Sequence, residues 1–172
     1  MMLKNFSRLL IAAAAMMMVD ASPTLARESV PFVSKQYAPG TIVIRTSERR
    51  LYLVGENGKA TRYKIAVGKP KSLWYGTKQV GKKDVEPAWM APPSLRRDPT
   101  APAVVIPGGA PNNPMGARAI GIGPELEYGI HGTNRPESIG TAASAGCFRM
   151  LNEDIIDLYE KVDIGTPIVV LK

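Results

Sequence analysis

Turn-forming residues interrupt this sequence so often that short strands, and not long helices, must make up most of its fold. The 172 residues include 16 glycines and 15 prolines, and stretches with helical spacing of apolar residues are few. Glycine and proline both end or bend regular elements, which favours short strands joined by turns. Strand-like runs at 41–45, 50–54 and 61–68, with the turn signal "GENG" at 55–58, predict an antiparallel meander. The expected fold class is mainly β, in one domain.

One segment near the C-terminus has helical periodicity instead. Asn152 is placed to cap a helix, and Glu153 and Asp154 follow in its first turn, where the helix dipole favours negative charge. The apolar residues of this segment repeat at helical spacing: Ile155, Ile156, Leu158, Tyr159 and Val162. We expect this stripe to pack on the sheet, and "TPIVVLK" at 166–172 to form the last strand.

The segment 69–118 has no clear periodicity and holds most of the prolines. Only one short strand is expected in it, near Lys78–Asp84. Because an irregular stretch of this length is seldom a plain connection, we expect it to cover a site or to form a lid.

The N-terminus has the layout of a secretory signal peptide. Lys4 and Arg8 precede an apolar run of eleven residues, "LLIAAAAMMMV", and small residues lead to an expected cut after Ala26. The apolar run is shorter than the roughly 20 residues that span a bilayer, although an uncleaved anchor is the alternative. The expected organisation is a signal peptide at 1–26, a linker or N-terminal arm at 27–39 and one domain at 40–172. We therefore expect export to the periplasm or cell envelope, with no stable transmembrane segment after processing.

The chain has one cysteine and one histidine, each in a glycine-rich turn: Cys147 in "SAGCFRM" and His131 in "YGIHGTN". An unpaired thiol in an oxidising compartment is either reactive or linked to another chain, and an imidazole beside it can accept its proton. Gly146 allows a tight turn and leaves room for a substrate, and the Gly132 carbonyl is placed to orient the imidazole ring. A buried, inert cysteine with a structural histidine is the competing interpretation, and composition alone leaves both open.

Other kinds of site fit the sequence poorly. A structural zinc site needs about four Cys or His ligands, and this chain has two such residues. Neither "GENGKA" nor "GKPKS" has the spacing of a phosphate-binding loop, and "GIGPELEYG" lacks a dinucleotide fingerprint. We expect no metal and no organic cofactor. The formal net charge of +7 suits envelope polyanions in an exported protein, and no nucleic-acid partner is expected.

The segment "IHGTNRPESIG…SAGCFRM" resembles the active-site signature of the L,D-transpeptidases, the YkuD-type catalytic domain. His131-Gly132-Thr133 begins the motif, and Gly146-Cys147-Phe148-Arg149 ends it. The resemblance extends over about residues 40–172 through these segments: "TIVIRTSERRLYLV", "YKIAVGKP", "EPAWMAPPS", "NNPMGARAIGI" and "NEDIIDLYEKVDIGTPIVV". It implies a sandwich-like β domain with one short helix after the nucleophile loop.

The resemblance also implies an activity, which is acyl transfer on peptidoglycan stem peptides. Cys147 would attack the carbonyl of the L-centre of a diamino acid in a tetrapeptide donor, D-Ala would leave, and a thioester would form. The acceptor amine would come from a second stem peptide, giving a 3→3 cross-link, or from an anchored envelope protein. His131 would act as the base and Arg149 would order the loop or meet a substrate carboxylate. Ser144 would bond near the thiolate or support the turn, and Trp89 would form a wall of the cleft.

One position departs from the family pattern, because Ala145 stands where a second histidine is usual. Losing one donor of this kind costs up to about 10²–10³ in rate where nothing replaces it. Three alternatives therefore stay open. They are an L,D-carboxypeptidase or endopeptidase that uses the same acyl-enzyme, a catalytically silent wall-binding module, and a thiol redox protein. The last fits least, because no second cysteine is present to resolve a disulfide.

Overall fold

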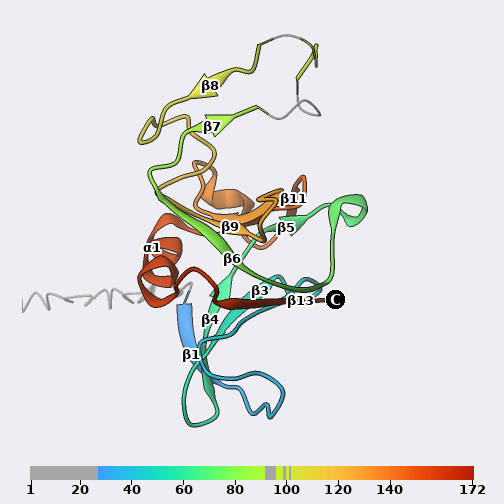
Figure 1. Ribbon diagram of the computed structural model, residues 1–172, viewed down its shortest axis with the longest axis vertical. Coiled ribbons are helices and arrows are strands. Elements are labelled where there is room, and N and C mark those ends of the chain that lie inside the picture. The colour runs from blue at the N-terminus through green and yellow to red at the C-terminus, as the bar shows by residue number, and fades with distance from the viewer. Residues whose placement is uncertain (1–26, 92–95, 99, 101) are drawn as a thin grey trace, which may run out of the picture.

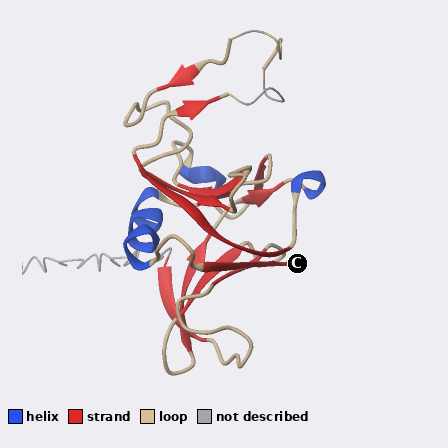
Figure 2. Cartoon of the chain, viewed as in Figure 1, coloured by secondary structure: helices blue, strands red, loops and turns tan. Residues whose placement is uncertain are grey.

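The computed structural model of the protein describes residues 27–91, 96–98, 100 and 102–172, and the expected signal peptide lies outside them. Strands predominate in this part of the chain (Figure 2). The strands are β1 (Arg27–Pro31), β2 (Ile42–Arg45), β3 (Arg50–Val54), β4 (Lys59–Lys64), β5 (Val67–Gly68), β6 (Gly76–Val85), β7 (Trp89–Met90), β8 (Val105–Ile106), β9 (Arg118–Ile122), β10 (Tyr128–His131), β11 (Ala142–Ser144), β12 (Phe148–Arg149) and β13 (Pro167–Leu171). The helical elements are α1 (Asn152–Lys161) and two 3-10 turns, η1 (Pro70–Ser72) and η3 (Pro136–Ser138). The prediction of a mainly β domain with one helix after the nucleophile loop is confirmed.

Nine strands form one strongly curled sheet in the order β1-β4-β3-β2-β13-β6-β9-β10-β12. Strand β6 joins its two halves, since its first residues pair with β13 and its later residues pair with β9 (Figure 1). The ladder to β9 shifts register between Val80 and Lys82, which bends the strand at this point. At the far edge, Ala66 exchanges two backbone hydrogen bonds with Arg149 on β12, so the end of the sheet curls back onto the segment after β4. This curl gives the fold its sandwich-like character.

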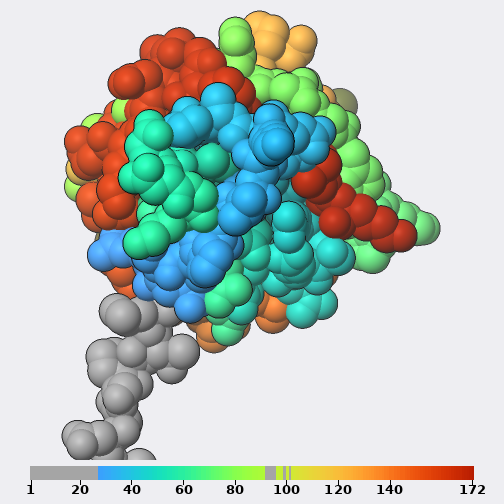
Figure 3. Space-filling view, turned by 90° about the horizontal axis from the view of Figure 1, so that it is seen from below, coloured from blue at the N-terminus to red at the C-terminus, as the bar shows by residue number. Residues whose placement is uncertain are grey.

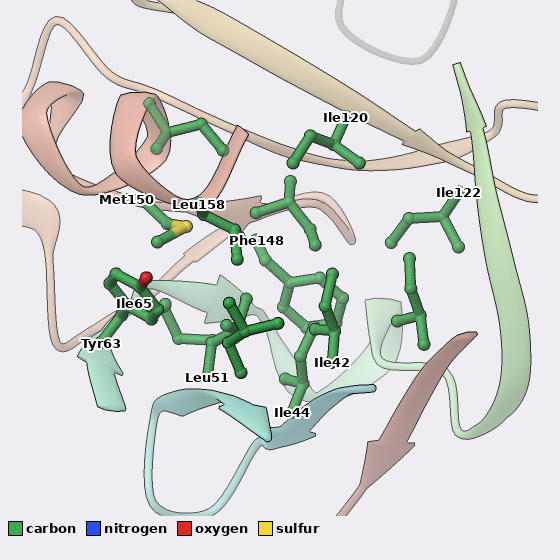
Figure 4. Close-up of a cluster of buried hydrophobic side chains, with 14 of the residues drawn as sticks. Ile42, Ile44, Leu51, Tyr63, Ile65, Ile120, Ile122, Phe148, Met150 and Leu158 are labelled. Carbon is green, nitrogen blue, oxygen red and sulfur yellow. The ribbon is translucent and has the colours of Figure 1, made fainter. Parts of the chain in front are cut away.

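The main hydrophobic core lies between the two halves of the curled sheet and under α1 (Figure 4). It includes inward-facing residues of the meander and of the strands that carry the site: Ile42, Ile44, Leu51, Tyr63, Ile120, Ile122, Ile130 and Phe148, all fully buried. Alternate residues of the meander face the other way and build a smaller cluster with Phe32. These N-terminal elements cover the lower end of the molecule (Figure 3). The predicted meander at 41–68 is thus confirmed as β2, β3 and β4.

Two irregular segments hold more regular structure than expected. In the stretch 69–118, the strand expected near Lys78–Asp84 is confirmed as part of β6, which is ten residues long and lies at the centre of the sheet, and the small β7–β8 hairpin was not expected. The stretch 27–39, expected as a linker or arm, begins with β1, which pairs antiparallel with β4. In both strands polar residues occupy most positions, because β1 is largely exposed and β6 buries only Val80 fully.

Helix α1 confirms the predicted periodicity with two differences. Ile155, Leu158 and Val162 are buried, Tyr159 packs against the core, and Ile156 is exposed on the outer face. The N-cap position belongs to Leu151 without a side-chain cap, and Asn152 is the first residue of the helix. In the described residues no helix is long and apolar enough to cross a membrane.

Candidate active site

The pairing of β10 with β12 builds the frame of the candidate site. The two strands are parallel, with Ile130 opposite Phe148 and His131 opposite Arg149. Ile130 and Phe148 face the core, so the alternation of side chains turns His131 and Arg149 to the other face. The backbone of Arg149 exchanges two hydrogen bonds with Ala66. The N–H of the next residue, Met150, donates to the His131 carbonyl (2.9 Å). The structure therefore brings the two predicted residues His131 and Arg149 side by side.

Cys147 immediately precedes β12 and is half-buried. The thiol lies close enough to the Gly129 N–H on β10 for this group to lower its pKa. Gly129 lies two residues before His131 on the same strand, which is about 7 Å along the strand. The lone thiol and the lone imidazole thus belong to one short stretch of strand pairing.

The His131 ring is oriented by its neighbour, as the sequence predicted. Its Nδ1 lies 2.7 Å from the Gly132 carbonyl oxygen. A carbonyl only accepts, so Nδ1 carries the proton and the neutral ring keeps Nε2 free as a base. Burial and, to a smaller extent, the positive charge of Arg149 together lower the pKa of His131 to about 4, against the opposing effect of the Gly132 hydrogen bond. His131 is therefore neutral at pH 7.

The thiol is also neutral at rest. Burial raises the pKa of Cys147 above its ordinary 9.0, although the Gly129 N–H and the charge of Arg149 both lower it. The resting pair is consequently a thiol and an imidazole, not a thiolate and an imidazolium. A neutral imidazole is the form of histidine that can accept a proton from a thiol.

Ser144 supports the turn that presents the cysteine. Its hydroxyl donates to the Cys147 carbonyl (2.5 Å) and accepts from the Gly146 N–H (3.1 Å). Of the two roles that the sequence left open for Ser144, these bonds describe support of the turn. They also engage the Gly146 N–H, so an oxyanion would need other donors.

Two glycines of the motif stand where a side chain would not fit. Gly146 has a φ of +136°, and a Cβ there would lie 2.8 Å from the Tyr128 ring. At Gly132 a Cβ would lie 2.2 Å from Asn152 Oδ1. Both are places where only glycine allows the backbone to approach its neighbours.

Asn152 has a larger role than the helix cap expected of it. Its Oδ1 accepts from the N–H groups of Ala117 (3.1 Å) and Thr133 (3.2 Å), and its Nδ2 donates to the Thr133 carbonyl (3.1 Å). These bonds tie the start of β9 and the turn after His131 to the helix. No local pattern in the sequence indicates this role of Asn152, because its two partner residues, Ala117 and Thr133, are distant from it along the chain.

The aromatic residues beside the Cys147 turn are not the one that the sequence predicted, Trp89. Tyr128 lies against Gly146, and Trp74 packs on Tyr128 and Phe148 with ring centroids at 5.3 and 6.2 Å. Trp89, the predicted wall, lies on β7 opposite Ile106, in the hairpin that projects from the sheet (Figure 1). A wall formed by Trp89 stays a prediction, and sequence reasoning missed Trp74 and Tyr128. In the part of the chain that the structure describes, no three His, Cys, Asp or Glu residues group as metal ligands would.

Comparison with known proteins agrees with the geometry. The YkuD family, described as the L,D-transpeptidase catalytic domain, matches residues 39–170. The probable L,D-transpeptidases YbiS and ErfK/SrfK of Escherichia coli K12 are 39% and 36% identical to the chain over 74% and 76% of its length. The chain spans only 43% of each of these relatives.

Solved structures show the same fold at low sequence identity. The catalytic domain of the Enterococcus faecium L,D-transpeptidase has a TM-score of 0.58 at 17% identity, covering 79% of this chain and 99% of that one. L,D-transpeptidase 3 of Mycobacterium tuberculosis, in complex with a faropenem-derived adduct, has a TM-score of 0.59 at 19% identity, covering 77% and 60%.

Proposed function

Because this chain belongs to the family of L,D-transpeptidase catalytic domains, we propose that it is a cysteine-dependent acyltransferase acting on peptidoglycan stem peptides. The observation that carries the proposal is the hydrogen bond from His131 Nδ1 to the Gly132 carbonyl, beside the Cys147 turn. It leaves Nε2 as the base of a neutral pair in which the thiol is the one nucleophile of its kind in the sequence.

The proposed reaction has two halves. In the first, the Cys147 sulfur attacks the carbonyl at the L-centre of the diamino acid of a tetrapeptide, and its proton passes to His131. The tetrahedral intermediate collapses, the C–N bond breaks, and His131 returns the proton to the amine of the departing D-Ala. In the second, His131 takes a proton from the acceptor amine, a C–N bond forms, and the thioester C–S bond breaks. The proton then returns to the sulfur.

We test the proposal with the chain from Arg27 to Lys172, a purified tetrapeptide and an amine acceptor. We expect release of D-Ala, a cross-linked product and a covalent adduct by mass spectrometry, none of which forms with Cys147→Ser. His131→Asn should retain folding and lose at least about 10²-fold in rate, as expected for a general base. A tripeptide without cross-linked product would instead identify a carboxypeptidase.

A wall-binding module without catalysis is the second candidate, motivated by Ala145 at the position of the usual second histidine. Exposure to faropenem distinguishes the two, since a related structure carries an adduct derived from it. We expect a mass gain on Cys147, and a chain that gains no mass and releases no D-Ala would support the binding module.

We also propose that the protein is exported and cleaved after Ala26. The proposal is supported by the charged start, the apolar run and the small residues that precede Arg27 in the sequence. The intact mass of the protein recovered from the cell envelope should begin at Arg27, and a mass that includes residues 1–26 would contradict cleavage.

A further inference from the structure

The β7–β8 hairpin is held at its base by a buried side chain. Asn113 is 2% exposed, and its Nδ2 donates to the carbonyls of Pro87 (2.8 Å) and Pro107 (2.9 Å). These prolines flank the hairpin and have no N–H to donate, so the pairing between β7 and β8 ends before them. The Asn113 amide therefore supplies the donors that strand pairing would have supplied.

Asn113 also shapes the turn that leads from the hairpin to β9. Its Oδ1 accepts from the Met115 N–H (2.9 Å), and its backbone carbonyl accepts from the Gly116 N–H (3.4 Å). The two proline carbonyls require the NH2 group on their side, so these bonds determine the orientation of the amide. The side chain is thus fixed between the base of the hairpin and the turn 113–116.

The turn ends against the peptide group that joins Gly132 to Thr133. Gly116 has a φ of +66°, and a Cβ there would lie 2.7 Å from the Gly132 carbonyl carbon and closer still to the Thr133 nitrogen. The two backbones are therefore in direct contact. Asn152 Oδ1 holds them together, since it accepts from the N–H groups of both Ala117 (3.1 Å) and Thr133 (3.2 Å).

The orientation of this peptide group decides the orientation of the imidazole. The peptide is trans and planar, so its N–H and its C=O point in opposite directions. Its N–H belongs to Thr133 and is held by Asn152, and its C=O is the Gly132 carbonyl, which lies 2.7 Å from His131 Nδ1. Through one rigid plane, Asn152 thus fixes the acceptor that keeps the ring proton on Nδ1 and leaves Nε2 free.

We propose that Asn113 and Asn152 are positioning residues for His131. Asn152 orients the peptide group that sets the tautomer of the imidazole, and Asn113 anchors the turn that packs against this peptide to the base of the hairpin. The inference rests on the proposed function in one respect, which is that His131 is the base. It goes beyond that function because the orientation of the base then depends on two side chains outside the segments that carry Cys147 and His131.

The tautomer of His131 tests the proposal without turnover. The chain has one histidine, so an NMR spectrum of the ring nitrogens of the untagged protein reports on this residue alone. At pH 7 we expect the Nδ1–H form to exceed the Nε2–H form about 10-fold, which corresponds to one good hydrogen bond. Asn152→Ala should reduce this ratio at least about 3-fold, and Asn152→Asp, which keeps the acceptor oxygen, should reduce it less.

Asn113→Asp tests the anchor, because it keeps the size of the side chain and the acceptor for Met115 but removes both donors to the proline carbonyls. We expect the tautomer ratio to fall at least about 3-fold. Asn112→Asp is the matched control, since it adds the same charge at the adjacent, exposed position and should leave the ratio unchanged. Asn113→Ser is uncharged and keeps one donor, so it should give an intermediate ratio and decides the case where the aspartate variant does not fold.

Release of D-Ala from the tetrapeptide supplies a second readout. A misplaced base slows the chemical step and leaves substrate binding intact, so kcat and kcat/KM should fall together, at least about 10-fold for Asn152→Ala. An unchanged tautomer ratio in folded Asn152→Ala, or the ratio of the unmodified chain in the folded Asn113 variants, would overturn the positioning role. Failure of the proposed function is distinguishable, because it would appear as no release of D-Ala by an unmodified chain whose His131 still holds the Nδ1–H tautomer.

Discussion

Acidification is the sharpest test of the proposed base. His131 has a pKa of about 4 because it is buried and lies beside Arg149. A base acts only when it is unprotonated, so a lowered pKa moves the acid limb of the activity profile to lower pH. At pH 5 a base with a pKa of about 4 is still about 90% neutral, whereas an ordinary histidine at 6.5 is only about 3% neutral.

The measurement is kcat/KM for release of D-Ala from the tetrapeptide, between pH 4 and 10. This parameter reports the ionisation of the free enzyme. We expect activity at pH 5 to remain within about 10% of the value at pH 7, with an acid limb near 4. The alkaline limb should lie above 9, because burial raises the pKa of Cys147. Thermal denaturation at each pH controls for loss of the folded state.

An acid limb near 6.5, with activity at pH 5 reduced to about 4% of that at pH 7, would refute the reasoning. Arg149→Gln supplies an independent check on the cause. Removing its charge should raise the pKa of His131 and move the acid limb upward, whatever the variant does to the height of the profile. An unmoved limb would mean that Arg149 does not act on the imidazole.

Three further predictions concern the frame of the site and the helix behind it. Burial raises the pKa of Asp154 to about 6, so the folded state holds this proton more tightly than the unfolded chain, and stability falls as pH rises from about 4 to 6. Asp154→Asn should therefore raise the free energy of unfolding, measured in urea at pH 7, by about 2 kcal/mol once the loss of the favourable helix-dipole interaction is subtracted. At pH 4 the substitution should change this free energy little, and equal effects at pH 4 and pH 7 would contradict the reasoning. Asn152→Ala leaves the N–H groups of Ala117 and Thr133 without their partner and should cost about 2–4 kcal/mol in urea denaturation, with Asn152→Asp losing less. Gly146→Ala should lower D-Ala release at least about 10-fold, because its Cβ would meet the Tyr128 ring, and unchanged activity would show that the turn can yield.

The parts of the fold that could be predicted from the sequence are those with a local pattern. Alternating apolar residues indicated β2, β3 and β4, and the 3.6-residue period indicated α1. Strand β1 was not predicted and β6 was predicted only over Lys78–Asp84, since most of their side chains are polar and they pair with strands distant in the chain. Such strands are specified by their neighbours and not by their own sequence.

The sequence pointed to candidate residues for the site but not to their arrangement. Cys147 and His131 stood out because each is unique, and the Gly132 carbonyl was expected to orient the ring. The placing of Arg149 beside His131 depends on a parallel pairing of two short strands, β10 and β12, which no local pattern indicates. Asn152 was misread as a cap because its preference for that position is local, whereas three tertiary hydrogen bonds decide its actual place.

The neutral state of Cys147 and His131 has a consequence for the reactivity of the thiol. Because the pKa of His131 is about 4 and burial raises the pKa of Cys147, transferring the proton from sulfur to nitrogen is strongly unfavourable in the resting protein. Oxidation and alkylation both proceed through the thiolate, so this separation of the two pKa values keeps the resting cysteine unreactive. Iodoacetamide should accordingly modify Cys147 at least about 10-fold more slowly at pH 7 than an unstructured cysteine peptide, and a faster rate would mean that the thiolate is already formed at rest.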